Sequence, residues 1–285
     1  MESRERETEQ KDQKKKQNKL LYIILVLVLA AVLAAVFFVM GNKGDAGKEE
    51  KPKEPPAQVK EEKPEEKEPE EEKVDILAEL GITVPEKELD WEALWEENED
   101  IYGWIYIPGT PVDYPVLQHP TDNEYYLNHN LDGSAGFPGC IYSEMWNNRG
   151  FLDRNTILYG HNMDDETVFS SLLHYADEEY FNTNRYIFIY TPGGVYVYDI
   201  FAAYEHSDEH LFYSYNYVSD AGYQEYLDMV FGTRDMGAHF REGVEVTIKN
   251  RILTLSTCIT PKPDKRFLVQ GVLLNDPDLY GGKIE

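Results

Sequence analysis

An uncharged run of 21 residues near the start of the chain, Leu20 to Met40, limits which part of the chain can form a globular fold. At about 1.5 Å per residue, a helix of this length crosses a hydrocarbon core of about 30 Å. The apolar region of a cleaved signal peptide is shorter, so residues 20–40 are expected to form an uncleaved transmembrane anchor. Residues 1–19 contain five lysines and are expected to stay in the cytoplasm, because basic flanks favour that side.

A charged segment follows the anchor. Residues 42–73 consist almost entirely of Lys, Glu, Pro and small or polar residues, and such a segment buries too little apolar surface to fold. Proline and charge repulsion should keep it extended. The sequence therefore predicts a cell-membrane protein with a single span, in which a disordered linker over residues 42–73 carries an extracellular domain over residues 74–285.

The expected extracellular domain is strongly acidic. Residues 74–285 carry 12 basic and 36 acidic side chains, a net charge of −24. Nucleic-acid recognition depends on Lys and Arg side chains that neutralise phosphates, so this balance excludes DNA and RNA as partners. An acidic surface can attract cationic partners, but it also serves simply to keep a domain soluble, which is the interpretation we favour.

Short apolar runs separated by turns dominate the domain and predict a mostly β fold. One clear amphipathic helix is predicted over residues 219–232, where Tyr223, Tyr226 and Leu227 recur at helical spacing and Ser219 can cap the first turn. Nine expected strands in about 185 residues favour a closed barrel or a sandwich. Those strands cover residues 103–107, 112–117, 139–143, 156–159, 185–190, 195–204, 244–249, 252–257 and 267–274, and shorter helices are expected over 74–80, 90–98 and 165–174.

The sequence TLSTC, Thr254 to Cys258, ends one of these strands and places a thiol where the backbone is held rigidly. His161 follows an earlier strand in the sequence YGHNM, and Arg266 lies eight residues beyond the cysteine. A thiolate is a nucleophile, an imidazole carries protons, and a guanidinium stabilises an oxyanion. Together they predict an acyl-transfer site. The second cysteine, Cys140, is expected to be a small buried residue, which leaves Cys258 free.

Two further histidines, His206 and His210, stand four residues apart beside Asp208 and Glu209. This spacing suits a metal site only on a helix, whereas the neighbouring residues predict a loop with solvent-exposed histidines. The sequence contains no calcium-binding loop of the EF-hand type. We therefore expect no metal, and the chemistry predicted for Cys258 requires no cofactor.

The chain resembles the class B sortases, the membrane-anchored cysteine transpeptidases of Gram-positive bacteria. Sortases carry a TLxTC motif with a histidine before it and an arginine after it, and Thr254 to Cys258, His161 and Arg266 match these in type and order. The resemblance covers about residues 88 to 275. It implies a sortase-type closed β-barrel of about eight strands, with N-terminal helices and an extra helix before the last strands. Class B is indicated by longer similarity over residues 98–110, 113–118, 125–127 and 159–163 and by the helix at 219–232.

The resemblance also implies a reaction. The protein is expected to cleave a C-terminal sorting signal of the NPxTx or PxTG type after its Thr, through a thioacyl intermediate on Cys258. The partners would be secreted proteins that bear the signal and an acceptor amine, either of peptidoglycan or of a pilin lysine. Ile259 stands where some relatives carry an acidic residue, and the segment 205–235 is expected to contribute to specificity. Weaker substrate-binding roles are implied for Asn123, Leu127, Tyr159, Ser256 and Thr257.

Two other functions are compatible with parts of the sequence. An extracellular cysteine hydrolase of the cell wall would use the same nucleophile, but in papain-like enzymes the cysteine usually precedes the histidine, and here His161 comes first. A catalytically inert surface scaffold would leave Cys258 unreactive toward thiol reagents. The complete TLSTC motif favours the transpeptidase over both.

Overall fold

The computed structural model describes residues 75–280 of the chain. The expected tail (1–19), anchor (20–40) and linker (42–73) lie outside these residues. Between residues 75 and 280, no helix has both the length and the apolar character needed to cross a membrane. The helices are α2 (Ile76–Glu79), α3 (Trp91–Glu97), α4 (Glu178–Thr183), α5 (Leu211–Ser214), α6 (Asp220–Gly232) and α7 (Pro277–Tyr280), with 3-10 helices η1 (Tyr125–Leu127) and η2 (Ser170–Ala176).

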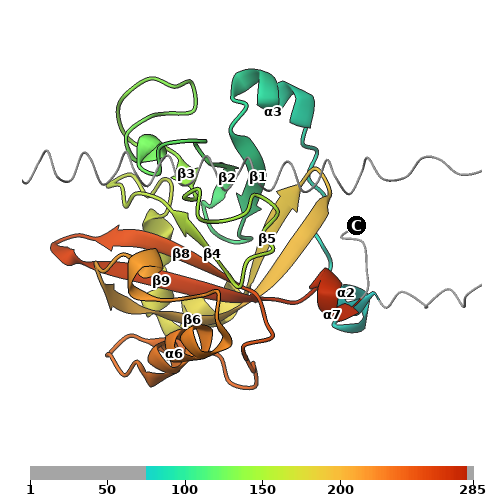
Figure 1. Ribbon diagram of the computed structural model, residues 1–285, viewed down its shortest axis with the longest axis vertical. Coiled ribbons are helices and arrows are strands. Elements are labelled where there is room, and N and C mark those ends of the chain that lie inside the picture. Colours follow the sequence, from blue (N-terminus) through green and yellow to red (C-terminus); the bar gives the residue numbers. More distant parts are fainter. Residues whose placement is uncertain (1–74, 281–285) are drawn as a thin grey trace, which may run out of the picture. The chain divides into compact units, whose positions relative to one another are not determined.

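Eight strands close into a barrel (Figure 1). They pair in the order β5, β1, β2, β3, β4, β8, β9, β6, and β6 pairs with β5 to complete the ring. A further strand, β7, pairs with β6 from outside this ring. The predicted closed barrel of about eight strands is confirmed. The strands are β1 (Ile101–Tyr106), β2 (Asp113–Leu117), β3 (Ile141–Tyr142), β4 (Asn155–Tyr159), β5 (Tyr186–Thr191), β6 (Gly194–Ser207), β7 (His239–Phe240), β8 (Ile252–Ile259) and β9 (Lys262–Leu273).

Strand β8 shows why apolar residues in the barrel strands are not confined to alternate positions. Successive side chains of a strand point to opposite faces, and here both faces are buried. Leu253 and Leu255 belong to the cluster that fills the barrel, together with Val269 of β9. Ile252 belongs to a second cluster, which includes Tyr226 of α6. The first half of β8 is therefore held in place from two sides.

Helix α6 packs on the outer face of the barrel, and the sequence predicted its position correctly (Figure 1). Ser219 caps it, since its Oγ accepts the N–H of Gly222 at 3.1 Å. A buried polar network then joins the helix to two strands. Gln270 Nε2 of β9 donates to the hydroxyl of Tyr226 at 2.6 Å and to Thr254 Oγ1 of β8 at 2.9 Å.

The helix expected over residues 165–174 is wrong in position and type. Asp165 Oδ1 accepts both the N–H of Thr167, at 3.2 Å, and its hydroxyl, at 2.6 Å. Such local bonds compete with helical hydrogen bonds. Glu166 and Val168 also have positive φ angles of 61° and 57°, which an α-helix does not contain. Within the expected range, only residues 170–174 are helical, as part of the 3-10 helix η2.

The strand expected over residues 244–249 is also wrong. Asn250 Oδ1 accepts the N–H of Thr247 at 2.9 Å and its hydroxyl at 3.0 Å, which closes a turn. Val246 is buried against the α6 cluster, so the apolar alternation reflects packing rather than strand pairing. The short strand β7, which lies earlier in the same connection, was not predicted.

Gly271 of β9 offers a test of how tightly the barrel is packed. A Cβ at this position would lie 2.8 Å from Tyr198 Cβ on the neighbouring strand, a distance that the backbone must move to relieve. We expect Gly271→Ala to lower the free energy of unfolding by about 1–3 kcal/mol. Gly232→Ala is the matched control, because no atom lies within 4 Å of its added Cβ. Equal melting temperatures for both variants in a thermal melt would contradict the packing described here.

Candidate active site

The parallel pairing of β4 and β8 brings the histidine and the cysteine to the same edge of the barrel. Tyr159 of β4 lies opposite Ser256 of β8 in the last registered pair. Beyond it, the N–H of Gly160 donates to the carbonyl of Ser256 at 3.2 Å, and Thr257 Oγ1 donates to the carbonyl of Gly160 at 2.8 Å. His161 and Cys258 each lie two residues beyond the Tyr159–Ser256 pair. They line one groove, which we call the catalytic groove.

Gly160 shows why the residue before the histidine has no side chain. A Cβ at Gly160 would lie 2.6 Å from Cδ2 of Phe169, a buried ring that cannot retreat. The backbone beyond it is held as well, because the N–H of Phe169 donates to the carbonyl of His161 at 3.1 Å. The sequence Tyr159-Gly160-His161 therefore allows the close packing that fixes the direction of the histidine.

The two cysteines have opposite environments. Cys258 is exposed and free, whereas Cys140 is free and buried. Burial raises the pKa of the Cys140 thiol to about 12, and its Sγ donates to the carbonyl of His129 at 3.6 Å. The structure agrees with the predicted difference between the two thiols. Cys140 is a packed, unreactive residue, and Cys258 is the thiol that a substrate can reach.

The hydrogen bond of His161 identifies which of its nitrogens is free. Nε2 lies 2.6 Å from the carbonyl of Leu127, and because a carbonyl only accepts, Nε2 carries the hydrogen. Phe137 packs against the ring with its centroid 5.0 Å away. Nδ1 makes no hydrogen bond to any residue between 75 and 280, so this nitrogen is available to exchange a proton.

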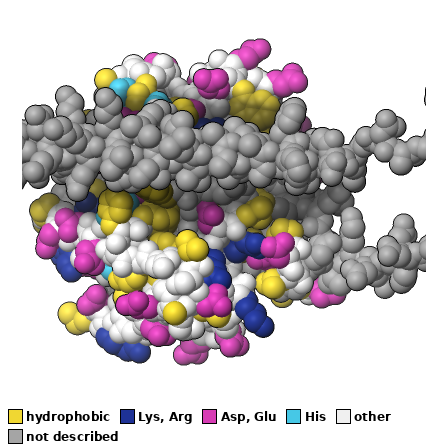
Figure 2. Space-filling view, in the orientation of Figure 1, with side chains coloured by type: hydrophobic (Ala, Val, Ile, Leu, Met, Phe, Trp, Pro, Cys, Tyr) yellow, Lys and Arg dark blue, Asp and Glu magenta, His cyan; other side chains and the backbone are white. Residues whose placement is uncertain are grey.

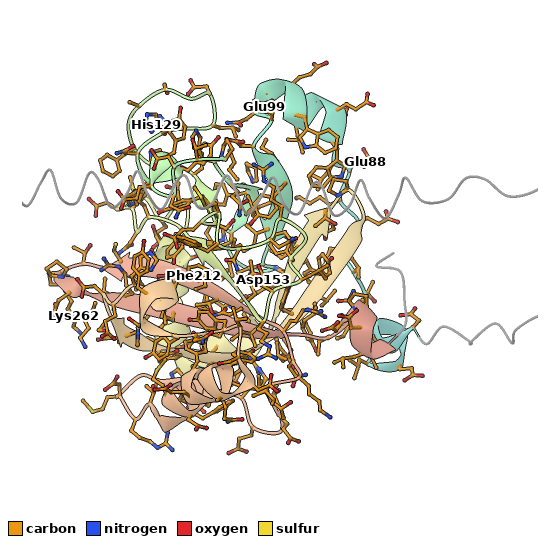
Figure 3. The ribbon with its side chains drawn as sticks, viewed as in Figure 1. Glu88, Glu99, His129, Asp153, Phe212 and Lys262 are labelled. Carbon is orange, nitrogen blue, oxygen red and sulfur yellow. The ribbon has the colours of Figure 1, made fainter. Side chains whose placement is uncertain are left out.

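Arg266 lies directly opposite Cys258 in the β8–β9 ladder, so both side chains project from the same face. Its Nη1 donates to the carbonyls of Pro263 and Lys265 at 3.0 and 2.9 Å, which leaves Nε and Nη2 without a partner among the described residues. Lys262, at the end of the hairpin in Figure 3, pairs with Glu205 at 2.7 Å and does not line the groove.

Four of the five residues with expected substrate-binding roles line the catalytic groove, namely Leu127, Tyr159, Ser256 and Thr257. The fifth, Asn123, is not among the lining residues. Its Oδ1 accepts the N–H of Met145 at 2.8 Å, so it supports the segment after β3. A direct contact of Asn123 with substrate stays a prediction.

A buried carboxyl group that is hydrogen-bonded to a histidine in the groove was missed by sequence reasoning. His210 Nε2 donates to Glu144 Oε1 at 2.8 Å, and the hydroxyl of Tyr159 lies 3.4 Å from Glu144 Oε2. The Glu144 side chain is only 7% exposed. Its pKa is raised above the usual range by burial, and the bond from His210 partly opposes that shift. The pair joins the end of β3 to the connection after β6 and forms a wall of the groove.

The expectation that His206 and His210 are solvent-exposed is therefore wrong. Both are half-buried and line the catalytic groove. His206 lies opposite Arg266 in the β6–β9 ladder, and burial lowers its pKa. In the part of the chain from 75 to 280, no three His, Cys, Asp or Glu residues come together as a metal site would require.

Known proteins share this barrel and are similar to this chain in sequence. The sequence model of the sortase domain family matches residues 105–274. Sortase B of Listeria monocytogenes is 36% identical over 180 residues, which cover 62% of this chain and 71% of that protein. The chain belongs to the sortase family, and within it to class B. Sortase B of Staphylococcus aureus is 34% identical over 168 residues, covering 59% of this chain and 67% of that protein.

Solved class B sortases agree with the fold. A Staphylococcus aureus sortase B–substrate complex gives a TM-score of 0.57 at 33% identity, covering 64% of this chain and 83% of that one. Sortase B of Clostridium perfringens gives a TM-score of 0.59 at 30% identity, covering 65% of this chain and all of that one. As a sortase, the protein is a cysteine transpeptidase, and the nucleophilic chemistry expected of the TLSTC cysteine is that of its family.

The Glu144–His210 pair yields a prediction about this sortase. Glu144→Gln keeps the shape of the side chain but removes its charge, so the hydrogen bond that it accepts from His210 becomes weaker. We expect the KM for a sorting-signal peptide to rise about tenfold, equivalent to about 1.4 kcal/mol, with little change in kcat. Steady-state cleavage kinetics measure both constants.

Glu124→Gln is the control for this experiment, because Glu124 lines the same groove but is exposed and forms no ion pair in the described structure. It should leave KM within twofold of the unmodified protein. A fall in kcat at constant KM for Glu144→Gln would mean that the pair acts on the chemistry instead of the groove wall.

Proposed function

We propose that this sortase cleaves a C-terminal sorting signal of the NPxTx or PxTG type after its Thr and joins the new carboxyl group to an amine of peptidoglycan or of a pilin. One observation carries the proposal. His161 and Cys258 leave adjacent parallel strands at the same level, and Arg266 stands opposite Cys258 on the next strand. Nucleophile, proton carrier and oxyanion donor thus come from three strands that run side by side.

The first half of the reaction forms a thioester. The thiolate of Cys258 attacks the carbonyl carbon of the Thr at the scissile bond, and the carbonyl oxygen becomes an oxyanion. Arg266 donates to this oxygen through Nε or Nη2, the two groups that its own hairpin does not use. The C–N bond then breaks, and the departing amine takes a proton from the imidazolium of His161.

The second half regenerates the thiolate. The incoming amine attacks the thioester carbon, and its proton passes to Nδ1 of His161, which is the free nitrogen. The new C–N bond forms, the C–S bond breaks, and Cys258 returns as thiolate beside an imidazolium. The three side chains supply the nucleophile, the proton transfer and the oxyanion contact that both halves require. The Leu127 carbonyl keeps the imidazole ring in one orientation throughout.

The relatives support a peptide substrate in the catalytic groove. One solved structure is a complex of Staphylococcus aureus sortase B with substrate, and another is a sortase B complexed with triglycine. In this chain, Leu127, Tyr159, Ser256 and Thr257 line the catalytic groove and are proposed to contact the sorting signal. Loops on a rigid barrel can change recognition without changing the catalytic strands.

We also propose that the enzyme works at the outer face of the cell membrane. Residues 20–40 have the length and composition of a single membrane span, and the five lysines before them favour a cytoplasmic N-terminus. The charged linker over residues 42–73 would then carry the catalytic domain away from the lipid surface, toward wall precursors and secreted proteins.

Intact-mass spectrometry of the full chain in detergent tests the proposed reaction. After incubation with NPxTx, SPxTG and LPxTG peptides, we expect an acyl adduct whose mass equals the peptide up to its Thr. Cys258→Ala should give no adduct, because the acylated atom is absent. Adding an amine such as triglycine or a lysine-bearing peptide should remove the adduct and yield the ligated product.

Cys140→Ala is the matched control and should acylate normally, because Cys140 is buried away from the groove. An adduct that persists in Cys258→Ala, or a complete absence of adduct with all peptides, would contradict the proposal. An adduct that water removes, and amines do not, would instead indicate a hydrolase.

A further inference from the structure

A second groove adjoins the catalytic groove. It has a volume of about 750 Å³ and is formed by residues between 146 and 155, before and at the start of β4, and by residues 212–218, between β6 and α6. Phe212 and Asp153, both labelled in Figure 3, come from its two sides. We call it the aromatic groove. Glu144 and His210 lie two residues before Trp146 and Phe212 on the same two segments and line the catalytic groove, so the hydrogen-bonded pair that they form lies between the two grooves along both segments.

Two aromatic side chains stand unusually exposed along this groove. Trp146 is 58% exposed and Tyr213 is 75% exposed. The ring of Tyr213 stacks on His210 with centroids 4.2 Å apart, and His210 is in turn bonded to Glu144. One face of the tyrosine is thus supported by a histidine that Glu144 holds in place, while the rest of the ring is open to solvent. Large apolar surfaces that are both exposed and held in place are typical of binding sites.

Several hydrogen-bond donors of the aromatic groove have no partner among the described residues. The indole N–H of Trp146 and the hydroxyl of Tyr213 make no hydrogen bond within residues 75–280. Arg154 Nη1 is buried without a partner, although its Nη2 pairs with Asp220. The one acid that lines the groove, Asp153, accepts two amide N–H groups through Oδ2, and its Oδ1 has no partner among the described residues. A buried donor without a partner calls for an explanation.

These features favour a neutral ligand with many hydroxyl and amide groups. Sugar rings present C–H groups that stack on the electron-rich face of Trp and Tyr, and their acetamido and hydroxyl oxygens accept from unpaired donors. Anionic ligands are disfavoured, because the domain is strongly acidic and Figure 2 shows Asp and Glu spread over its visible face. The lining residues include one acid, Asp153, and one base, Arg154, so the groove has no net charge to attract a cationic peptide.

We propose that the aromatic groove binds an N-acetylated oligosaccharide, the glycan part of the wall polymer whose amine resolves the thioester on Cys258. The role in transfer rests on the proposed transpeptidation, whereas the binding of the saccharide does not. A glycan held behind the Glu144–His210 wall would bring its attached peptide amine toward the catalytic groove. The groove thus serves to position the acceptor.

Calorimetric titration of the full chain in detergent with chitotetraose, a neutral oligomer of N-acetylglucosamine, tests this proposal. Saturable binding is expected. Trp146→Ala and Tyr213→Ala should each weaken it at least ~10-fold, with unchanged melting temperatures because both side chains are exposed. Trp95→Ala is the control, since Trp95 is 43% exposed on α3 and lines neither groove, and it should bind as tightly as the unmodified chain.

The outcomes separate this proposal from the catalytic one. Trp146→Ala should still form the acyl adduct on Cys258 but should transfer it more slowly to a glycan-linked amine than to triglycine. Absence of chitotetraose binding, or equal binding in all three variants, overturns the proposal. So does a proline-rich peptide that binds where the saccharide does not, since aromatic grooves also take such peptides. Failure of acylation in the unmodified chain would count against the proposed function alone.

Discussion

The in-register parallel pairing of β4 and β8 is the constraint on which the catalytic groove depends. Side chains alternate along a strand, so a slip of one residue would turn Cys258 toward the opposite face of the sheet. The register is secured by a buried polar contact, because Thr254 Oγ1 donates to Asn155 Oδ1 at 2.8 Å. A slip would break this bond and leave the Asn155 oxygen without its donor in a dry environment, which is costly. The contact that sets the position of Cys258 therefore lies earlier in β8, at Thr254.

A second constraint is the charge buried at the groove wall. A carboxylate as enclosed as Glu144 loses its hydration, and it is compensated by His210, 66 residues away in sequence. The same histidine supports Tyr213, so one hydrogen-bonded pair shapes both the catalytic groove and the aromatic groove. The buried carboxylate thus lies where substrate specificity is expected, whereas Cys258 and Arg266 lie on paired strands and His161 lies two residues beyond β4.

The parts of the structure that sequence could predict are those with local patterns. The alternating and continuous apolar runs located eight barrel strands, Ser219 and its helical stripe located α6, and the TLSTC motif located Cys258. The features that could not be predicted depend on contacts between residues far apart in the sequence. Nothing near Glu144 indicates that it pairs with His210, and the apolar alternation over residues 244–249 looks like a strand but packs as a loop under α6. The turn at Asp165 replaced a helix through a side-chain bond that propensity does not capture.

The central claim is that barrel register places His161 where it transfers the proton for the reaction at Cys258, and the acylation rate of a His161 variant tests this most directly. Intact-mass spectrometry of the full chain would follow acylation by sorting-signal peptides in the unmodified protein and in His161→Ala. The account predicts that His161→Ala forms the acyl adduct at least ~100-fold more slowly, because the leaving amine has no proton donor. Acylation of the variant at the rate of the unmodified protein would show that His161 does not act in the reaction, and would contradict the account.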